Sequence, residues 1–236
     1  MADQGSVVVV GGTRAIGFEI VRHYATAGDD VVLTGQTEAN VAAAVERAAG
    51  LPGSVTGLTF DLADPLTIRA ALAGIGPVRR LALVAIDRDS NTVADYDVTR
   101  AIRLATLKLV GFTEVVHVLL DRLTPNASLL LFGGQAKDLP YPGSTTVSTV
   151  NGGVEGIVRT LVHEIRPHRV NCLHPGIVGD SPYWENKQAA LEATAKRTPT
   201  GRLTSMEDIV GAAVFLLENE GMNGVNLKVD GGLHCM

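Results

Sequence analysis

Short β-branched runs alternate along the chain with longer stretches of helical periodicity, and this alternation constrains the fold more than any other feature. The runs cover residues 6–10, 31–34, 81–86, 128–132, 169–173 and 225–229. Most are apolar at consecutive positions, as strands are when helices cover both faces of their sheet. The order predicts right-handed crossovers and a doubly wound, mostly parallel α/β sheet, with a ligand crevice at the carboxyl ends of the strands.

The helical patterns lie at residues 15–27, 38–49, 65–73, about 93–123 and 147–165. Only residues 176–203 look irregular, and no internal repeat or linker divides the chain. A chain of 236 residues fits within one α/β core, so we expect a single domain over residues 1–236.

Composition excludes several classes of function. Hydrophobic residues make up 46% and charged residues 19%, which is too apolar for a disordered chain. The net charge of −5 and the lack of a basic run argue against a nucleic-acid partner. No apolar run is long enough for a membrane span, and we expect no export signal. Cys172 and Cys235 match no metal-ligand spacing or disulfide framework, so we expect no metal site and a cytoplasmic location.

A glycine turn joins the first predicted strand to the first predicted helix. Gly11 and Gly12 follow the run Val7–Val10, and Gly17 lies at the start of the helical pattern. Free backbone N–H groups and a helix dipole can receive a pyrophosphate in such a turn. The alternative is a tight turn that needs glycine for its positive φ and binds nothing. The position after the first strand favours nucleotide binding.

Two features bear on which nucleotide would bind. The guanidinium of Arg14, within the turn, can meet a 2′-phosphate. Thr34-Gly35-Gln36, at the end of the second run, offers no carboxylate for a pair of free ribose hydroxyls. We therefore expect NADP(H) in preference to NAD(H).

The whole chain resembles the short-chain dehydrogenase/reductase family. Gly11-x-x-x-Ala15-x-Gly17 is similar to the family's cofactor turn, with Ala15 in place of the middle glycine. Asp61-Leu62 resembles the pair that receives the adenine amino group. Residues 169–176 resemble the sixth strand and its Pro-Gly turn beside the nicotinamide, and residues 201–209 and 229–232 resemble the C-terminal signature.

This resemblance implies a seven-stranded Rossmann-type sheet, a nicotinamide cofactor, and a small-molecule substrate or ligand. It implies a homodimer or homotetramer, since the helices within residues 106–123 and 147–165 are apolar over much of their circumference. It implies cofactor contacts at Gly11, Thr13, Arg14, Ala15, Ile16, Gly17, Gln36, Asp61, Leu62, Ala85, Asn151, Pro175, Gly176 and Val178.

The family's catalytic positions hold residues that transfer no proton. Members use a tyrosine, a lysine one helical turn later, a serine upstream and a more distant asparagine. In this register Val147 occupies the tyrosine position, Asn151 the lysine position and Gly134 the serine position, and the asparagine falls near Thr106 or Leu107. Because a valine donates no proton and a neutral amide cannot lower a phenol pKa, we expect ordinary carbonyl reduction to be weak or absent.

Other polar groups are candidates for the vacant role. Tyr141, Asp87 and Tyr183 are candidate acid–base groups, although Tyr141 with Lys137 is interpreted as ordinary loop structure and Asp87 as a solvated carboxylate. Residues 176–203 correspond to the family's substrate lid, in which Tyr183 and Trp184 either pack the lid or form an aromatic wall. His174 is interpreted as a satisfied strand-end histidine and Cys172 as core packing. The expected substrate pocket comprises Gln135, Tyr141, Asp180, Ser181, Tyr183 and Trp184.

Three functional hypotheses remain open. The first is an NADP(H)-dependent oxidoreductase that passes hydride to a substrate needing little protonation by the protein. The second is a nucleotide-dependent binding, sensing or scaffold subunit that has kept the fold and lost turnover. The third is a non-redox isomerase or cyclase that uses the vacated pocket as an apolar mould.

Overall fold

A seven-stranded parallel sheet forms the centre of the molecule, and the computed structural model describes residues 5–235. Its order is β3-β2-β1-β4-β5-β6-β7, with every neighbouring pair parallel. The order reverses between β1 and β4, which confirms the doubly wound fold. The strands are β1 (Ser6–Val10), β2 (Val31–Gly35), β3 (Val55–Thr59), β4 (Val78–Leu83), β5 (Leu123–Phe132), β6 (Arg169–Pro175) and β7 (Asn226–Val229).

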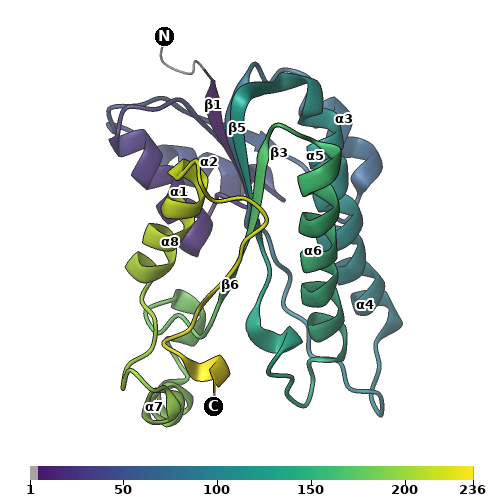
Figure 1. Cartoon of the computed structure of the whole chain (residues 1–236), viewed down its shortest axis with the longest axis vertical. Coiled ribbons are helices and arrows are strands. Elements are labelled where there is room, and N and C mark those ends of the chain that lie inside the picture. The colour runs from purple at the N-terminus through teal and green to yellow at the C-terminus, as the bar shows by residue number, and fades with distance from the viewer. Residues whose placement is uncertain (1–4, 236) are drawn as a thin grey trace.

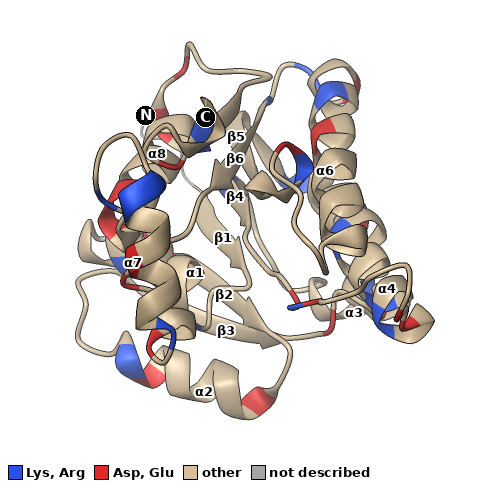
Figure 2. Ribbon diagram, turned by 90° about the horizontal axis from the view of Figure 1, so that it is seen from below, with Lys and Arg blue, Asp and Glu red and all other residues tan. Residues whose placement is uncertain are grey.

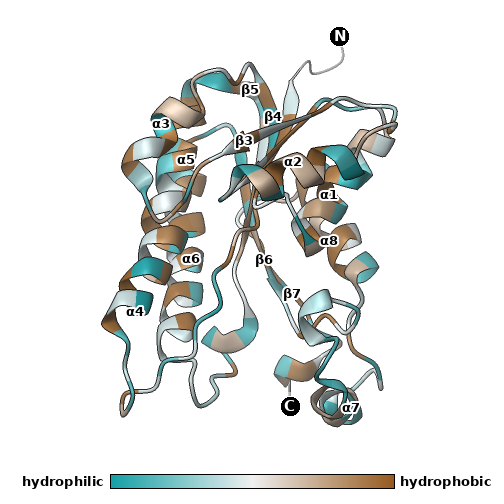
Figure 3. Cartoon of the chain, turned by 180° about the vertical axis from the view of Figure 1, so that it is seen from behind, coloured by the Kyte–Doolittle hydropathy of each residue, from teal (hydrophilic) through white to brown (hydrophobic). Residues whose placement is uncertain are grey.

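Helices cover both faces of the sheet (Figure 1). One layer holds α1 (Ala15–Thr26), α2 (Glu38–Arg47) and α8 (Met206–Glu218). The other holds α3 (Ile68–Ala71), α4 (Val98–Ala105), α5 (Phe112–Leu119) and α6 (Thr145–Glu164). Each layer has its own buried cluster against the strands, and Figure 3 shows hydrophobic colouring along the central strands. None of the helices within residues 5–235 is long and apolar enough to cross a membrane.

The helical stretch expected over residues 93–123 is interrupted in the structure. It begins only at Val98, where the Asp97 carboxylate accepts a hydrogen bond of 3.0 Å from the Arg100 backbone N–H and caps α4. Thr106–Gly111 forms a π-helix between α4 and α5, and Leu123 already belongs to β5. Gly111 ends the π-helix, and a Cβ at this position would lie 3.1 Å from the Leu62 carbonyl carbon. The wide turn of the π-helix therefore packs against the segment after β3.

The segment 176–203 is more regular than its sequence indicated. Val178 forms a parallel bridge with Thr204, a short 3-10 helix spans Pro182–Trp184, and α7 spans Gln188–Arg197. The helix was missed because α7 buries only Leu191 within the molecule and therefore shows no apolar stripe, although its alanines favour a helix.

The glycine turn after β1 packs tightly against the end of β4. Gly11 has φ +86°, and a Cβ there would lie 2.7 Å from the backbone nitrogen of Ala85. A Cβ on Gly17 would lie 2.9 Å from the Gly11 carbonyl carbon. Ala15 has φ +47°, in the left-handed region that glycine adopts without a steric penalty. Ala15 therefore carries backbone strain at the first residue of α1.

Relief of this strain gives a stability prediction. Replacing Ala15 with glycine is expected to raise the free energy of unfolding by about 0.5 to 1 kcal/mol, because the left-handed penalty of alanine exceeds the extra chain entropy of glycine. Urea denaturation measures the change. Ala42→Gly, on the exposed side of α2, is the matched control and should lower stability by about 1 kcal/mol. A loss in both variants would show that Ala15 is unstrained.

Candidate functional site

The residues expected to bind a ligand lie along one edge of the sheet. Because all seven strands are parallel, the segments after β1, β2, β3, β4, β5 and β6 meet at their carboxyl ends, which we call the carboxyl edge. Figure 2 is seen from below, the side on which α7 lies, and shows charged residues in the surrounding loops. The segments that contain most of the residues expected to bind a ligand follow the ends of these strands.

Gly134 and Asn151 are direct neighbours at the end of β5. A Cβ on Gly134 would lie 2.7 Å from Asn151 Nδ2. Asn151, on α6, is 2% exposed, and its Oδ1 has no hydrogen-bond partner among the described residues. The adjacent Gln135 donates from Nε2 to the His174 carbonyl at 3.0 Å, but its own buried Oε1 is also unpartnered. Two carbonyl oxygens beside Gly134 therefore lack donors, which is costly unless a ligand or water supplies them.

Val147 precedes Asn151 by one turn of α6 and is half-buried. Its side chain carries no polar atom. Among these three residues, the only side-chain donor is the Asn151 amide. The unpartnered oxygens of Asn151 and Gln135 can accept hydrogen bonds from a ligand. Protonation of a carbonyl oxygen would instead need an acidic side-chain donor, and Gly134, Val147 and Asn151 provide none.

His174 is fully buried at the end of β6 and uses both ring nitrogens. Nδ1 accepts a hydrogen bond of 3.1 Å from the Gly134 backbone N–H, and Nε2 lies 3.3 Å from Asn226 Oδ1. Burial lowers the pKa of His174, so its neutral form is favoured. These contacts agree with the interpretation of a satisfied strand-end histidine and leave no proton to transfer.

Lys137 also has its partners within the protein. Its ammonium, on a side chain that is 7% exposed, lies 2.6 Å from the Asp138 carboxylate and 2.8 Å from Glu155. Burial opposes its charge, but hydrogen bonds to these two carboxylates raise the pKa of Lys137 overall. Tyr141 is exposed and takes no part in this cluster. Tyr141 and Lys137 therefore do not form an acid pair, as expected.

Arg103 of α4 joins Asp61 and Asp87, a link that the sequence analysis missed. Its Nη1 and Nη2 lie 2.9 and 3.2 Å from the Asp61 carboxylate, and its Nε lies 2.7 Å from Asp87 Oδ2. Gln36 Nε2 and the Ala63 backbone N–H also donate to Asp61, at 3.0 and 2.9 Å. Burial opposes the charge of Asp61, but these donors lower its pKa overall.

This link changes the expectations for both carboxylates. Asp61 already accepts four hydrogen bonds, so an adenine amino group has to displace one of its donors. The Asp87 side chain is 35% exposed and also pairs with Arg103, a contact that its sequence did not indicate. The sequence contains one sign of this link: Arg103 lies in the helix that follows the loop containing Asp87.

Two guanidinium groups flank the glycine turn. Arg14 is exposed and forms no ion pair within residues 5–235. Arg47 of α2 donates a hydrogen bond to the Thr13 carbonyl and stacks over the Phe18 ring, 3.9 Å from its centroid. Arg47 is distant from the turn in the chain, so only Arg14 was predictable from the sequence. Together they give the turn a local positive charge.

The lid segment contains a cluster of aromatic and cationic side chains. The Tyr183 and Trp184 rings meet edge to face with centroids 4.8 Å apart. Lys187 Nζ lies 4.0 Å and Arg88 Cζ 3.7 Å from the Tyr183 ring centroid. A hydrogen bond from Lys187, with the charge of Arg88, lowers the pKa of Tyr183 although burial opposes this.

Two other lid residues have partners within the protein. Asp180 Oδ1 accepts a 2.7 Å hydrogen bond from the Met206 backbone N–H, at the start of α8, and the Ser181 carbonyl accepts one of 2.9 Å from Trp184. Asp180 therefore anchors the lid to α8, and any ligand that contacts its carboxylate has to share it with this helix.

Lys108 is a buried cation that the sequence analysis also missed. It lies in the π-helix and donates to the Phe132 carbonyl at 2.5 Å, with Nζ 4.8 Å from the Phe112 ring centroid. Burial lowers the pKa of Lys108 to about 8, and burial raises the pKa of Cys172 to about 12. Lys108 thus fixes the end of β5 immediately before Gly133, and Cys172 behaves as inert packing.

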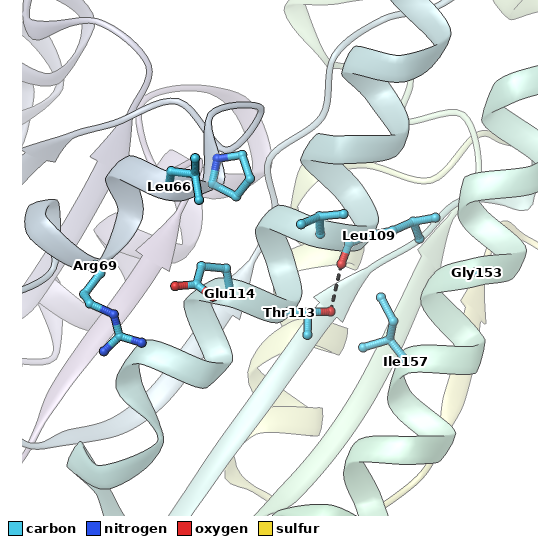
Figure 4. Close-up of a pocket in the computed structure, with 9 residues that line it drawn as sticks. Leu66, Arg69, Leu109, Thr113, Glu114, Gly153 and Ile157 are labelled. Carbon is cyan, nitrogen blue, oxygen red and sulfur yellow. Dashed lines mark hydrogen bonds between the residues drawn. The ribbon is translucent and has the colours of Figure 1, made fainter.

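A hollow of about 660 Å³ lies away from the carboxyl edge, between α3, α5 and α6. Figure 4 shows Leu109 and Ile157 on one side of it and Leu66, Arg69 and Glu114 on the other. It contains none of the residues that the sequence assigned to cofactor or substrate.

The unpartnered oxygen of Asn151 leads to a prediction. Replacing Asn151 with leucine, which has a similar shape, is expected to raise the free energy of unfolding by about 1 kcal/mol, because it removes an unsatisfied buried acceptor. Asn151→Asp is the control and should destabilise the chain by placing a charge there. Thermal unfolding without ligand measures both. A leucine variant less stable than the wild type would show that the amide is satisfied.

Comparisons with known proteins agree with this architecture. A family model described as enoyl-(acyl carrier protein) reductase matches residues 10–234. The chain is 26% identical to the short-chain dehydrogenase/reductase malC of Malbranchea aurantiaca, covering 97% of this chain and 94% of that protein. It is 29% identical to L-xylulose reductase of Bos taurus, covering 95% and 94%.

Solved structures show the same fold. The structure titled MalC reductase/Diels-Alderase from Malbranchea aurantiaca superposes with a TM-score of 0.90 at 24% identity, over 99% of this chain and 98% of that one. A putative betaketoacyl-ACP reductase superposes with a TM-score of 0.86 at 24% identity, over all of both chains. With the family model matching nearly its whole length, the chain belongs to the short-chain dehydrogenase/reductase family.

Proposed function

We propose that this protein is an NADP(H)-binding oxidoreductase of its family in which Val147, Asn151 and Gly134 replace the usual proton-transfer residues. One observation carries the proposal: the buried Asn151 Oδ1 lacks a donor beside Gly134. A ribose hydroxyl of a bound nicotinamide nucleotide would supply that donor. The arrangement supports cofactor binding while leaving ordinary carbonyl reduction weak or absent.

The residues at the carboxyl edge fit the cofactor part by part. The turn from Gly11 to Gly17 and the start of α1 would hold the pyrophosphate, through backbone N–H groups and the helix dipole. Arg14, with Arg47 beside the same turn, would meet a 2′-phosphate, and Gln36 offers no carboxylate to repel it. The remaining contacts would come from Thr13, Ala15, Ile16, Asp61, Leu62, Ala85, Pro175, Gly176 and Val178.

The bound cofactor would supply hydride, and this chain's own residues would position it. General acid–base groups contribute about 10² to 10⁴ in rate, so the replacements at positions 134, 147 and 151 leave positioning as the main contribution of those three residues. A chain that binds the nucleotide without any turnover would be a sensing or scaffold subunit.

A second candidate function is a non-redox cyclisation in the same pocket. The observation that favours it is the likeness to MalC, whose structure is titled a reductase and a Diels-Alderase. Val147 and Gly134 would leave apolar space beneath the lid for such a substrate. Product formed with the cofactor's redox state unchanged would identify this activity.

The hollow between α3, α5 and α6 supports self-association as a homodimer or homotetramer. Leu66, at its rim, is 93% exposed, and Val110 is also exposed. A second copy placed on this face would cover these apolar side chains.

The cofactor proposal is tested by titration of intrinsic fluorescence. Trp184 is the only tryptophan and lies in the lid, so NADPH is expected to quench its emission. NADPH should bind more tightly than NADH, and Arg14→Met should weaken NADPH binding by about tenfold or more through loss of a charged hydrogen bond, with NADH little affected. Arg22→Met, on the exposed side of α1, is the control. A flat titration with both nucleotides would contradict the proposal.

Restoring the replaced groups provides a second test. Val147→Tyr with Asn151→Lys is expected to gain NADPH-dependent reduction of small ketones by at least tenfold, since it returns a proton donor and its activating charge. Val147→Phe with Asn151→Met gives similar volumes without proton transfer and should gain nothing. Adding Gly134→Ser also requires the residue-151 side chain to move, because the new Cβ lies within 2.7 Å of the Asn151 amide. A folded, NADPH-binding Tyr/Lys variant without activity would show that the register is wrong.

A further inference from the structure

Most titratable side chains around Gly134 are already engaged. His174 uses both ring nitrogens, Lys137 is bound by two carboxylates, and Asp87 is bound by Arg103. Tyr141 has no cation within contact distance among the described residues. None of these four groups can replace the missing proton donor without breaking an existing contact or acting without an activating charge.

Tyr183 differs from all of them. Its phenol is 41% exposed, and two cations contact its ring: Lys187 Nζ at 4.0 Å and Arg88 Cζ at 3.7 Å from the centroid. Lys187 follows Tyr183 by one helical turn of sequence, across the end of the 3-10 helix Pro182–Trp184. Two positive charges stabilise a phenolate, which is what an acid that must release its proton near neutral pH requires.

The topology places this cluster above the end of β5. Arg88 belongs to the loop after β4, and Tyr183 belongs to the segment after β6. In the sheet, β5 lies between β4 and β6, and neighbouring strands are about 4.8 Å apart. A side-chain contact between the β4 loop and the β6 segment therefore has to arch across the carboxyl end of β5, where Gly133 and Gly134 lie. In Figure 1, α7, which belongs to the same lid segment, lies beneath the sheet.

We infer that Tyr183 is a catalytic residue of this protein, donating from the lid the proton that position 147 can no longer supply, with Lys187 and Arg88 as its positioning residues. The inference rests on the proposed function, since it assumes that hydride is delivered at the carboxyl edge. It assigns the site a substrate with a carbonyl group held between Gly134 and the lid.

The proton and electron balance is simple. A bound reduced nicotinamide would supply the hydride for the new C–H bond at the carbonyl carbon, and the electron pair of the C=O π bond would move to the oxygen. That oxygen takes the proton from Tyr183 Oη, so the phenol O–H bond breaks and the alcohol O–H bond forms. After release of the alcohol, solvent would reprotonate the exposed Tyr183 phenolate. Lys187 and Arg88 keep their protons throughout.

The kinetic test compares tyrosine variants on a panel of ketones and aldehydes with NADPH. Tyr183→Phe is expected to lower kcat by about 10² or more while the KM for NADPH changes less than threefold. Tyr96→Phe, an exposed tyrosine elsewhere in the β4–α4 loop, is the matched control and should keep the wild-type rate. Lys187→Met should lower kcat, and Lys187→Arg should restore part of it.

The pH dependence of kcat distinguishes a catalytic Tyr183 from a Tyr183 that only packs the lid. Reduction needs the protonated phenol, so kcat should fall as pH rises through the lowered pKa of Tyr183. In Lys187→Met this fall should shift to higher pH, because one of the two stabilising charges is gone. A profile that is identical in the wild type and Lys187→Met would overturn the inference.

The third readout is independent of activity. Ultraviolet difference titration of the wild type against Tyr183→Phe isolates one of only four tyrosines, and the isolated phenol should ionise below the usual tyrosine range. A phenol that titrates normally, or a Tyr183→Phe variant with the wild-type rate, would overturn the inference. A chain that binds NADPH and reduces no member of the panel would also overturn it and leave cofactor binding standing. A chain that binds no nucleotide would refute the proposed function as well.

Discussion

The parallel alignment of seven strands is the constraint on which the rest of this molecule depends. Backbone hydrogen bonding between parallel neighbours brings every strand's carboxyl end to one edge, so residues far apart in the chain become neighbours there. Gly11, Asp61, Gly134 and Gly176 each follow or end a different strand. Without this alignment, the turn after β1 would not pack against Ala85, and Gly134 would not meet Asn151 on the next helix.

Hydrogen-bonding capacity divides this edge into two parts. Around Gly134 it presents unpartnered acceptors and an aliphatic side chain, while the Gln135 amide and the Lys137 ammonium donate to a carbonyl and to carboxylates. In the lid it presents a phenol between two cations. Beneath both parts, Lys108 holds the Phe132 carbonyl from within the core and fixes the end of β5. In the function and the further inference proposed above, this division would place nucleotide positioning around Gly134 and proton donation in the lid.

The strands were predicted most accurately where every residue is buried and apolar. The start of β4 was set too late, at residue 81, because Arg79 and Arg80 occupy half-buried strand positions, where they form ion pairs with Asp29 and Glu218. No range was predicted for β3, whose run contains Gly57; a Cβ at that glycine would lie 3.0 Å from Val45 of α2. The predicted helical stretch continued past the π-helix, since a single wide turn leaves no mark on apolar periodicity.

The sequence by itself determined the doubly wound fold, the place of the glycine turn and the absence of a proton donor at positions 134, 147 and 151, because periodicity and residue chemistry are local properties. Only the tertiary structure decided that Arg103 pairs with Asp61 and Asp87, which groups His174 contacts, and that Arg88 reaches Tyr183. Those contacts join side chains from different strands and loops. These side chains are close in space but far apart in the sequence, so motif spacing does not reveal that they are in contact.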